Sequence, residues 1–481
     1  MTHKVVVLTE RFAPWLTRWS KAVTAHYSSG VLETVFNLLL RAMGMVLVCA
    51  IVAAGCSSSP EVVSTNVSEP GTSSTAPVDD AGATAQPETS TAEAATPTSV
   101  APAETTPSTA LAVEPSTTTT TSITTTTTTT IAAPSSALEC AAALPLEVRI
   151  GQLLFPLITQ DEFPVANDLV AQGHMGGVVV LGRPDATIRD DIAALQSESL
   201  LGPLIVAVDE EGGRVQRVDH LVGEQPSARS VAATDDAATA RQRASDHAVA
   251  LGELGFTMNL APVADLDTGV FVGDRAYSSD PEVVSEYALT VAEGILDGGL
   301  TPVIKHFPGH GAGLDSHTGL PTIPAVDELR GQDLVPFERA IERGGLPIMI
   351  GHLVVPGLTG DRPATLSSAA VDGLLRGELG FDGLVMTDAL NMAAIAATTT
   401  NAQAAELSID AGVDLIMLGS LNAVEGTVAH LSDAVANGRL SEDQINSSLL
   451  RVLDERQIEI CGFPQDFLPA IGCETDSPAC R

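Results

Sequence analysis

The chain has 481 residues and a formal net charge of −36, with 24 lysines and arginines against 60 acidic residues. A protein this acidic repels nucleic acid and anionic lipid surfaces, which argues against a role in binding either polyanion. The length allows two or three average domains, or one large domain with additional segments.

The first 56 residues predict an export signal. The apolar run Ala42 to Cys56 is short for a membrane span but typical of a signal-peptide core. Small residues precede Cys56 and three serines follow it, a pattern that resembles a bacterial lipobox. We therefore expect a lipid on Cys56 to anchor the protein to the membrane as an extracytoplasmic, cell-surface lipoprotein. An uncleaved N-terminal anchor is the alternative, and it implies the same side of the membrane.

Residues 57–139 predict a disordered linker. They contain no lysine or arginine and consist mostly of serine, threonine, proline and alanine, with a nearly pure threonine run over 117–130. Such a segment has too little apolar surface to offset the entropy lost on folding. We expect an extended stalk that separates a folded domain from the membrane.

Four cysteines flank the region that follows: Cys140, Cys461, Cys473 and Cys480. Outside the cytoplasm they can form disulfides, and four cysteines allow three pairings. We favour Cys140–Cys461, which would join the two ends of a domain at 140–461. Cys473–Cys480 would then close a small loop in a C-terminal tail, 462–481.

Within that domain, apolar runs alternate with amphipathic stretches such as 281–299 and 325–345. The runs are rich in Val, Ile and Leu, as in strands buried on both faces, and lie at 153–158, 176–182, 203–209, 257–265, 301–306, 346–352, 382–388 and 414–419. Eight strand–helix units predict an α/β fold with a parallel sheet, specifically a single (β/α)8 TIM-like barrel. A doubly wound sheet is the alternative, although no glycine-rich nucleotide loop follows the first run.

Polar residues gather at the C-terminal ends of these runs, where catalytic groups of such barrels lie. They are Asp209, Asp265, Lys305, His306, His352 and Asp388. Lys305 is the only lysine after Lys21. Charged residues at strand ends can also be merely solvated, but the recurrence of this placement favours an active site.

The sequence KHFPGHGAGLDSH, residues 305–317, limits the types of reaction that the site could catalyse. Its histidines could ligate zinc, but Pro308 and Gly309 prevent the helix that would align two imidazoles, so we expect no metal and no cofactor. The chain has neither a serine nucleophile elbow nor a P-loop. Acid–base and nucleophilic work by carboxylates and a histidine remains, as glycosidic cleavage requires. Asp388 suits the nucleophile, and Asp315 can orient His317 as the acid/base.

Several motifs, in order, resemble glycoside hydrolase family 3, and in particular its single-domain β-N-acetylhexosaminidases of peptidoglycan turnover. They are DEEGGRVQR (209–217), NLAPVAD (259–265), GDRAYSSDP (273–281), KHFPGHG with DSH (305–317), PATLS (363–367) and VMTDAL (385–390). The resemblance implies a nucleophile at Asp388 and an acid/base dyad of Asp315 and His317. It also implies sugar-binding residues, which are Asp209, Arg275, Lys305 and His306, with Arg214 and His352 as candidates further from the sugar.

Two positions depart from the family pattern. Three residues, 312–314, separate GHG from DSH where four are expected, and Glu210 stands where a histidine is common. The short spacer bears on how His317 reaches the site.

The expected function is a retaining exo-β-N-acetylglucosaminidase that acts on β-linked GlcNAc of peptidoglycan or chitin-type fragments. A β-glucosidase, a β-xylosidase or an N-acetylglucosaminide phosphorylase of the same family is an alternative. A non-catalytic sugar-binding surface lipoprotein is an alternative of another class.

Overall fold

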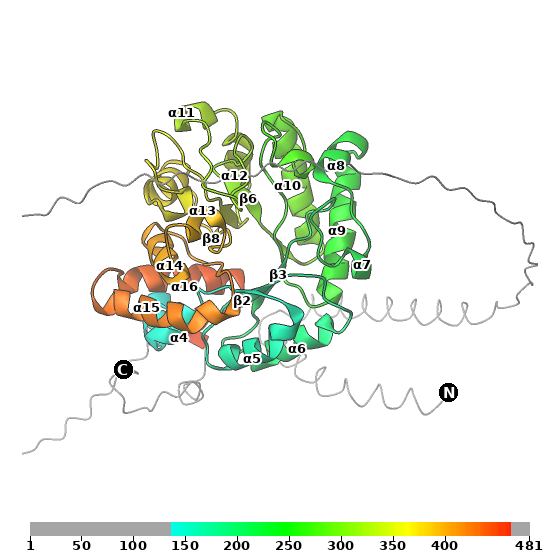
Figure 1. Cartoon of the computed structure of the whole chain (residues 1–481). Helices are drawn as coiled ribbons and strands as arrows, with labels where there is room; N and C mark the ends of the chain where they lie inside the picture. The colour runs from blue at the N-terminus through cyan, green and yellow to red at the C-terminus, as the bar shows by residue number, and fades with distance from the viewer. Residues whose placement is uncertain (1–135, 463–481) are drawn as a thin grey trace, which may run out of the picture. The chain divides into compact units, whose positions relative to one another are not determined.

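A computed structural model of the chain describes residues 136–462 (Figure 1). The predicted signal with Cys56, the linker up to residue 135, and the tail that holds Cys473 and Cys480 lie outside the described residues. Helix α3 (Ala137–Ala142) begins three residues before the predicted start of the domain, where Ser136 and Glu139 form a reciprocal cap. No helix in residues 136–462 combines the length and the apolar character needed to cross a membrane.

Short, buried parallel strands form the centre of the fold. They are β1 (Leu157–Ile158), β2 (Gly177–Val180), β3 (Ile205–Val208), β4 (Met258–Asn259), β5 (Thr301–Pro302), β6 (Ile304–Phe307), β7 (Ile348–Ile350) and β8 (Val385–Thr387). One sheet has the order β1-β2-β3-β4-β5 and the other β6-β7-β8. All these pairings are parallel, which confirms the predicted α/β class.

Isolated parallel bridges extend the pairing beyond the two sheets. Val263, after β4, bridges to Lys305 in β6. Leu415 bridges to Met386 in β8, and the adjacent Ile416 bridges to Leu154 near β1. The predicted run 414–419 therefore contributes bridging residues where a strand was expected, and the other seven runs each contain a strand.

Helices surround the strands (Figure 1). They are α4 (Leu146–Gly151), α5 (Phe163–Ala171), α6 (Ile188–Glu198), α7 (Asp219–Val222), α8 (Ala228–Thr234), α9 (Ala237–Glu253), α10 (Pro281–Asp297), α11 (Val326–Leu329), α12 (Val335–Arg343), α13 (Ala393–Ala396), α14 (Asn401–Asp410), α15 (Val424–Ala436) and α16 (Glu442–Glu455). A π-helix spans Ala369–Glu378. Their apolar faces cover the strands, as where Phe337 of α12 meets Phe307 of β6 edge-on at 5.4 Å.

The two predicted amphipathic stretches have different outcomes. The first forms α10, which begins at Pro281 behind an Asp280 cap and ends at Asp297, close to the predicted bounds. The second was expected as one helix over 325–345 but forms two, α11 and α12. Arg330 adopts an extended backbone and Gly331 has a φ of 74°, so the helix cannot continue through them.

The disulfide Cys140–Cys461 is present, as predicted, and joins residues 321 positions apart in the sequence. Cys140 lies in α3 and Cys461 in the 3-10 turn Ile460–Gly462. Glu139 and Cys140 belong to the helix that Ser136 caps, and the Ser136 carbonyl lies 3.6 Å from the Cys461 sulfur. The bond therefore fixes the entry and the exit of the domain at one place.

Loss of this disulfide is expected to lower the free energy of unfolding by about 2–5 kcal/mol, because the unfolded chain regains the freedom of a very long loop. Urea unfolding of Cys461→Ser under oxidising conditions measures the effect. Cys140→Ser should give the same loss, and the double variant no further loss, since both changes remove one bond. A Cys461→Ser protein as stable as the parent would contradict the expectation.

Candidate active site

Polar side chains meet in a cavity of about 390 Å³ at the C-terminal ends of the strands. Because parallel strands end on the same side, residues that follow them are brought together there. The charged and histidine side chains that line the cavity are Asp209, Glu211, Arg217, Arg275, Lys305, His306, His310, His317 and Asp388. The structure therefore places Asp209, Arg275, Lys305, His306, His317 and Asp388, which the sequence proposed, around one cavity.

Lys305 lies in β6 and is only 3% exposed. Its Nζ donates to Asp209 Oδ1 at 2.8 Å and lies 2.7 Å from Glu211 Oε1. Burial lowers the pKa of this lysine, but Asp209 and Glu211 outweigh it and hold the pKa above its usual value. The ammonium is thus charged at neutral pH and anchored on two carboxylates beside the cavity.

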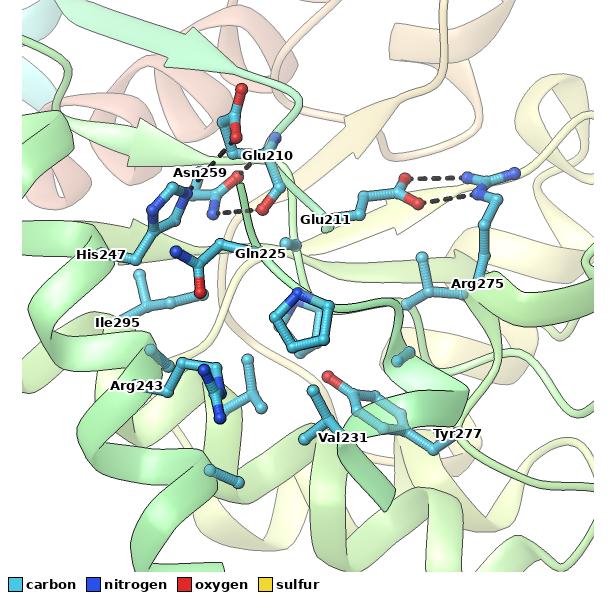
Figure 2. A pocket seen from close by; sticks show the side chains of 18 residues that line it. Glu210, Glu211, Gln225, Val231, Arg243, His247, Asn259, Arg275, Tyr277 and Ile295 are labelled. Carbon is cyan, nitrogen blue, oxygen red and sulfur yellow. Dashed lines mark hydrogen bonds and ion pairs between the residues drawn. The ribbon is translucent and has the colours of Figure 1, made fainter. Parts of the chain in front are cut away.

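Glu211 is a member of the site that the sequence prediction missed. Arg275 donates to both of its carboxylate oxygens, from Nε at 2.7 Å and Nη2 at 2.8 Å (Figure 2). Burial raises the pKa of Glu211, but Lys305 and Arg275 lower it well below its usual value. A bidentate pair of this kind fixes the plane of the guanidinium, so Glu211 determines how Arg275 faces the cavity. The sequence feature that could have indicated Glu211 is the run of three acidic residues that follows β3.

Asp265 fixes the two histidines of the KHFPGH segment, His306 and His310. It is 0% exposed, and its Oδ1 accepts the backbone N–H groups of His306 and His310 at 3.1 and 2.7 Å. Its Oδ2 lies 2.7 Å from His306 Nδ1. Burial raises the pKa of Asp265, but its contacts with His306 and His310 lower it to about 2. Asp265 was recognised as a strand-end residue, but its role in holding these two histidines was not predicted.

Asp315 and His317 form the expected hydrogen-bonded pair. Asp315 Oδ1 lies 2.9 Å from His317 Nδ1 and also accepts the His317 backbone N–H. Burial raises the pKa of Asp315, but the hydrogen bonds from His317 lower it below its usual value. Since a carboxylate only accepts, Nδ1 carries the proton, and Nε2 remains to exchange a proton with a substrate. His317 is 67% exposed and lies at the open side of the cavity.

The glycines of this loop are required by close packing. A Cβ on Gly309 would lie 2.5 Å from the Cβ of Asp333, and Gly309 has a φ of 118°. A Cβ on Gly311 would lie 2.3 Å from the Leu266 carbonyl. Close packing at Gly309 and Gly311 therefore fixes this part of the loop against its neighbours.

Asp388 follows β8 and is partly exposed to the cavity. Its Oδ1 accepts the Ala389 N–H at 2.7 Å, which fixes the carboxylate. Burial raises the pKa of Asp388, but His306, His352 and the Ala389 N–H hold it below its usual value. The carboxylate is therefore ionised at neutral pH and rigid, as a nucleophile must be.

Three candidates do not line the cavity: Asp315, His352 and Arg214. His352 is fully buried between Thr365 and Ala389. Its Nε2 donates a hydrogen bond to the Ala389 carbonyl at 3.0 Å. Burial lowers the pKa of this histidine. Arg214 turns to the surface and pairs with Asp274. The arginine of the same motif that enters the cavity is Arg217, with Nη2 3.7 Å from Asp209 Oδ2.

Asp333 is the carboxylate behind Gly309, and its Oδ1 makes no hydrogen bond within the described residues. Burial and the nearby Asp265 raise the pKa of Asp333 to about 6. The folded protein therefore binds a proton more tightly there than the unfolded chain, and stability is lost as the pH rises toward that pKa. Asp333→Asn, which mimics the protonated form, should add up to about 3 kcal/mol of stability at pH ~8 and nothing at pH ~3. Urea unfolding at both pH values measures this, and an equal effect at both would contradict it.

Comparisons with known proteins identify the family of the chain. The model of the "Glycosyl hydrolase family 3 N terminal domain" matches residues 145–454. The chain is 40% identical over 302 residues to beta-hexosaminidase LpqI of Mycobacterium tuberculosis, which is 60% of this chain and 77% of that protein.

Solved structures are similar over the same region. M tuberculosis LpqI has a TM-score of 0.63 and 37% identity, covering 67% of this chain and 97% of that chain. A family 3 beta-N-acetylglucosaminidase from Paenibacillus sp. has a TM-score of 0.63 and 32% identity, covering 68% of each chain. The chain therefore belongs to glycosyl hydrolase family 3 and is a glycoside hydrolase.

Proposed function

We propose that the protein is a retaining exo-β-N-acetylglucosaminidase that removes terminal β-linked GlcNAc from peptidoglycan or chitin-type fragments. The observation that carries the proposal is the shared cavity: Asp388, His317 and the cluster around Lys305 all line it. Relatives named beta-hexosaminidase and beta-N-acetylglucosaminidase support the proposal that the sugar removed is N-acetylglucosamine.

In this reaction the sugar hydroxyls are held by Asp209, Arg275, Lys305 and His306. Asp388 attacks the anomeric carbon while His317 Nε2 donates a proton to the departing oxygen, and a glycosyl-enzyme forms. His317, now neutral, then takes a proton from the water that attacks this intermediate. Asp388 leaves, and the product keeps the β configuration.

We also propose that the strands and helices form a complete (β/α)8 barrel. The bridges Val263–Lys305, Met386–Leu415 and Leu154–Ile416 support it, because they link the sheet edges in the order that a closed ring needs. The position of the cavity at the strands' C-terminal ends also fits this barrel.

We also propose that the enzyme works outside the cytoplasm, lipid-anchored through Cys56. The disulfide Cys140–Cys461 supports an oxidising compartment. Metabolic labelling with an alkynyl fatty acid tests the anchor: the parent chain should be labelled and Cys56→Ala should not. Label retained by Cys56→Ala would contradict the assignment.

The function is tested by comparing aryl β-N-acetylglucosaminide with aryl β-glucoside and aryl β-xyloside. Faster turnover of the first supports the proposal, and a preference for either of the others would replace it. Proton NMR of the first-formed sugar should show the β-anomer. Release of a sugar 1-phosphate when phosphate is added would indicate a phosphorylase, and binding without turnover would indicate a non-catalytic protein.

A further inference from the structure

Glu210 lies between two residues of the site but faces away from it. Asp209 and Glu211 line the substrate cavity, whereas the Glu210 side chain has no exposed surface and does not line it. Glu210 instead lines a neighbouring pocket, to which Glu211 and Arg275 also contribute (Figure 2). Successive residues of extended chain point to opposite sides, which explains the alternation. Glu210 therefore does not touch the substrate, and its carboxylate is not used by the proposed reaction.

That carboxylate closes the loop that follows β3. Glu210 Oε1 accepts the backbone N–H groups of Arg217 and Val218, the latter at 2.6 Å. The Glu210 backbone is fixed as well, because Asn259 in β4 accepts its N–H at 3.1 Å and donates to its carbonyl at 3.0 Å. The two ends of the segment 210–218 are thus joined through one side chain.

The second carboxylate oxygen faces helix α9. Glu210 Oε2 lies 3.3 Å from Nε2 of His247, which is 8% exposed. Both Oε2 and the two His247 ring nitrogens lack hydrogen-bond partners within the described residues. The carboxylate is therefore positioned between the loop and the helix behind it.

The loop carries the groups that reach the sugar. Glu211 orients Arg275 and Lys305, and Arg217 enters the cavity beside Asp209. The backbone of Arg217 is held directly by Glu210. We propose that Glu210 is a positioning residue that closes the loop 210–218 so that Glu211 and Arg217 face the substrate together.

The test uses three substitutions of Glu210 that distinguish the effect of side-chain length from the effect of negative charge. Glu210→Gln keeps an oxygen that can accept both N–H groups. Glu210→Asp keeps the charge but is one methylene too short, and Glu210→Ala removes the acceptor. Glu224→Ala, an exposed glutamate of the same region, is the matched control.

The proposal rests on the proposed function, so kinetics and a substrate-independent measurement are combined. KM for an aryl β-N-acetylglucosaminide should rise about tenfold or more in the Ala and Asp variants, because neither side chain can make the two hydrogen bonds that close the loop, with kcat changed far less. The Gln variant and the control should stay close to the parent. Hydrogen exchange in peptides that cover 210–218 should quicken in the Ala and Asp variants only.

Each outcome decides the proposal. Faster exchange with a raised KM supports it. Unchanged exchange and KM in the Ala and Asp variants, or a Gln variant as impaired as Ala, would overturn it, and so would loss of kcat alone. If the parent fails to turn over the substrate, the proposed function fails, while exchange still tests the loop. If the Ala variant does not fold, the Asp and Gln variants give the same comparison.

Discussion

Replacing Asp388 by asparagine is expected to lower kcat on an aryl β-N-acetylglucosaminide by about 10⁴- to 10⁶-fold, the range seen when a central catalytic group is removed. The amide has nearly the same shape, so the cavity and its sugar contacts should persist, but it is a poor nucleophile. Steady-state kinetics measure the loss, and thermal unfolding should show little change.

Asp382→Asn is the matched control, because Asp382 is an exposed aspartate that lies just before the same strand. It should leave kcat unchanged. Azide should partly restore turnover to Asp388→Ala by entering the space of the carboxylate and attacking the sugar, giving an α-glycosyl azide. Parental kcat in Asp388→Asn would remove Asp388 from its assigned role.

Lys305→Met is expected to lower kcat/KM by about 10²- to 10³-fold and the free energy of unfolding by about 3 kcal/mol. The methionine fills similar volume but leaves Asp209 and Glu211 close together without the ammonium between them. Lys305→Arg should recover part of both losses, since it restores charge with a planar donor group. Kinetics and urea unfolding of the same preparations measure the two effects.

The control for this loss is Arg183→Met, which removes an exposed cation that pairs with Asp219. An exposed pair contributes at most about 1 kcal/mol, so stability and kcat/KM should barely change. Equal effects of the two substitutions would show that Lys305 has no special role in the site.

Strand ends were the predictable part of the site. Lys305 and Asp388 could be located because buried apolar runs are easily read, and the first polar residue after a parallel strand lies on a known side of the sheet. The α/β class followed from the same runs. The helix break at Gly331 was missed because an amphipathic pattern continues through residues that do not themselves favour helix.

Loop geometry was the unpredictable part. The sequence offers both Arg214 and Arg217 after β3, and only the closed loop determines that Arg217 enters the cavity. Glu211 was missed because three consecutive carboxylates look equivalent until the backbone direction is known. Asp265 was noted at a strand end, but its hold on His306 and His310 depends on a chain reversal that no local pattern predicts.

The disulfide makes residues 140–461 a closed covalent ring, and a lysine-specific protease can exploit this. Lys305 is the only lysine between residues 22 and 481, and in the folded protein it is buried beside the cavity. Cleavage there requires the site to open, so its rate reports that opening and should fall when a sugar binds. The cut opens the ring without separating the fragments, so a non-reducing gel shows one band and a reducing gel shows two.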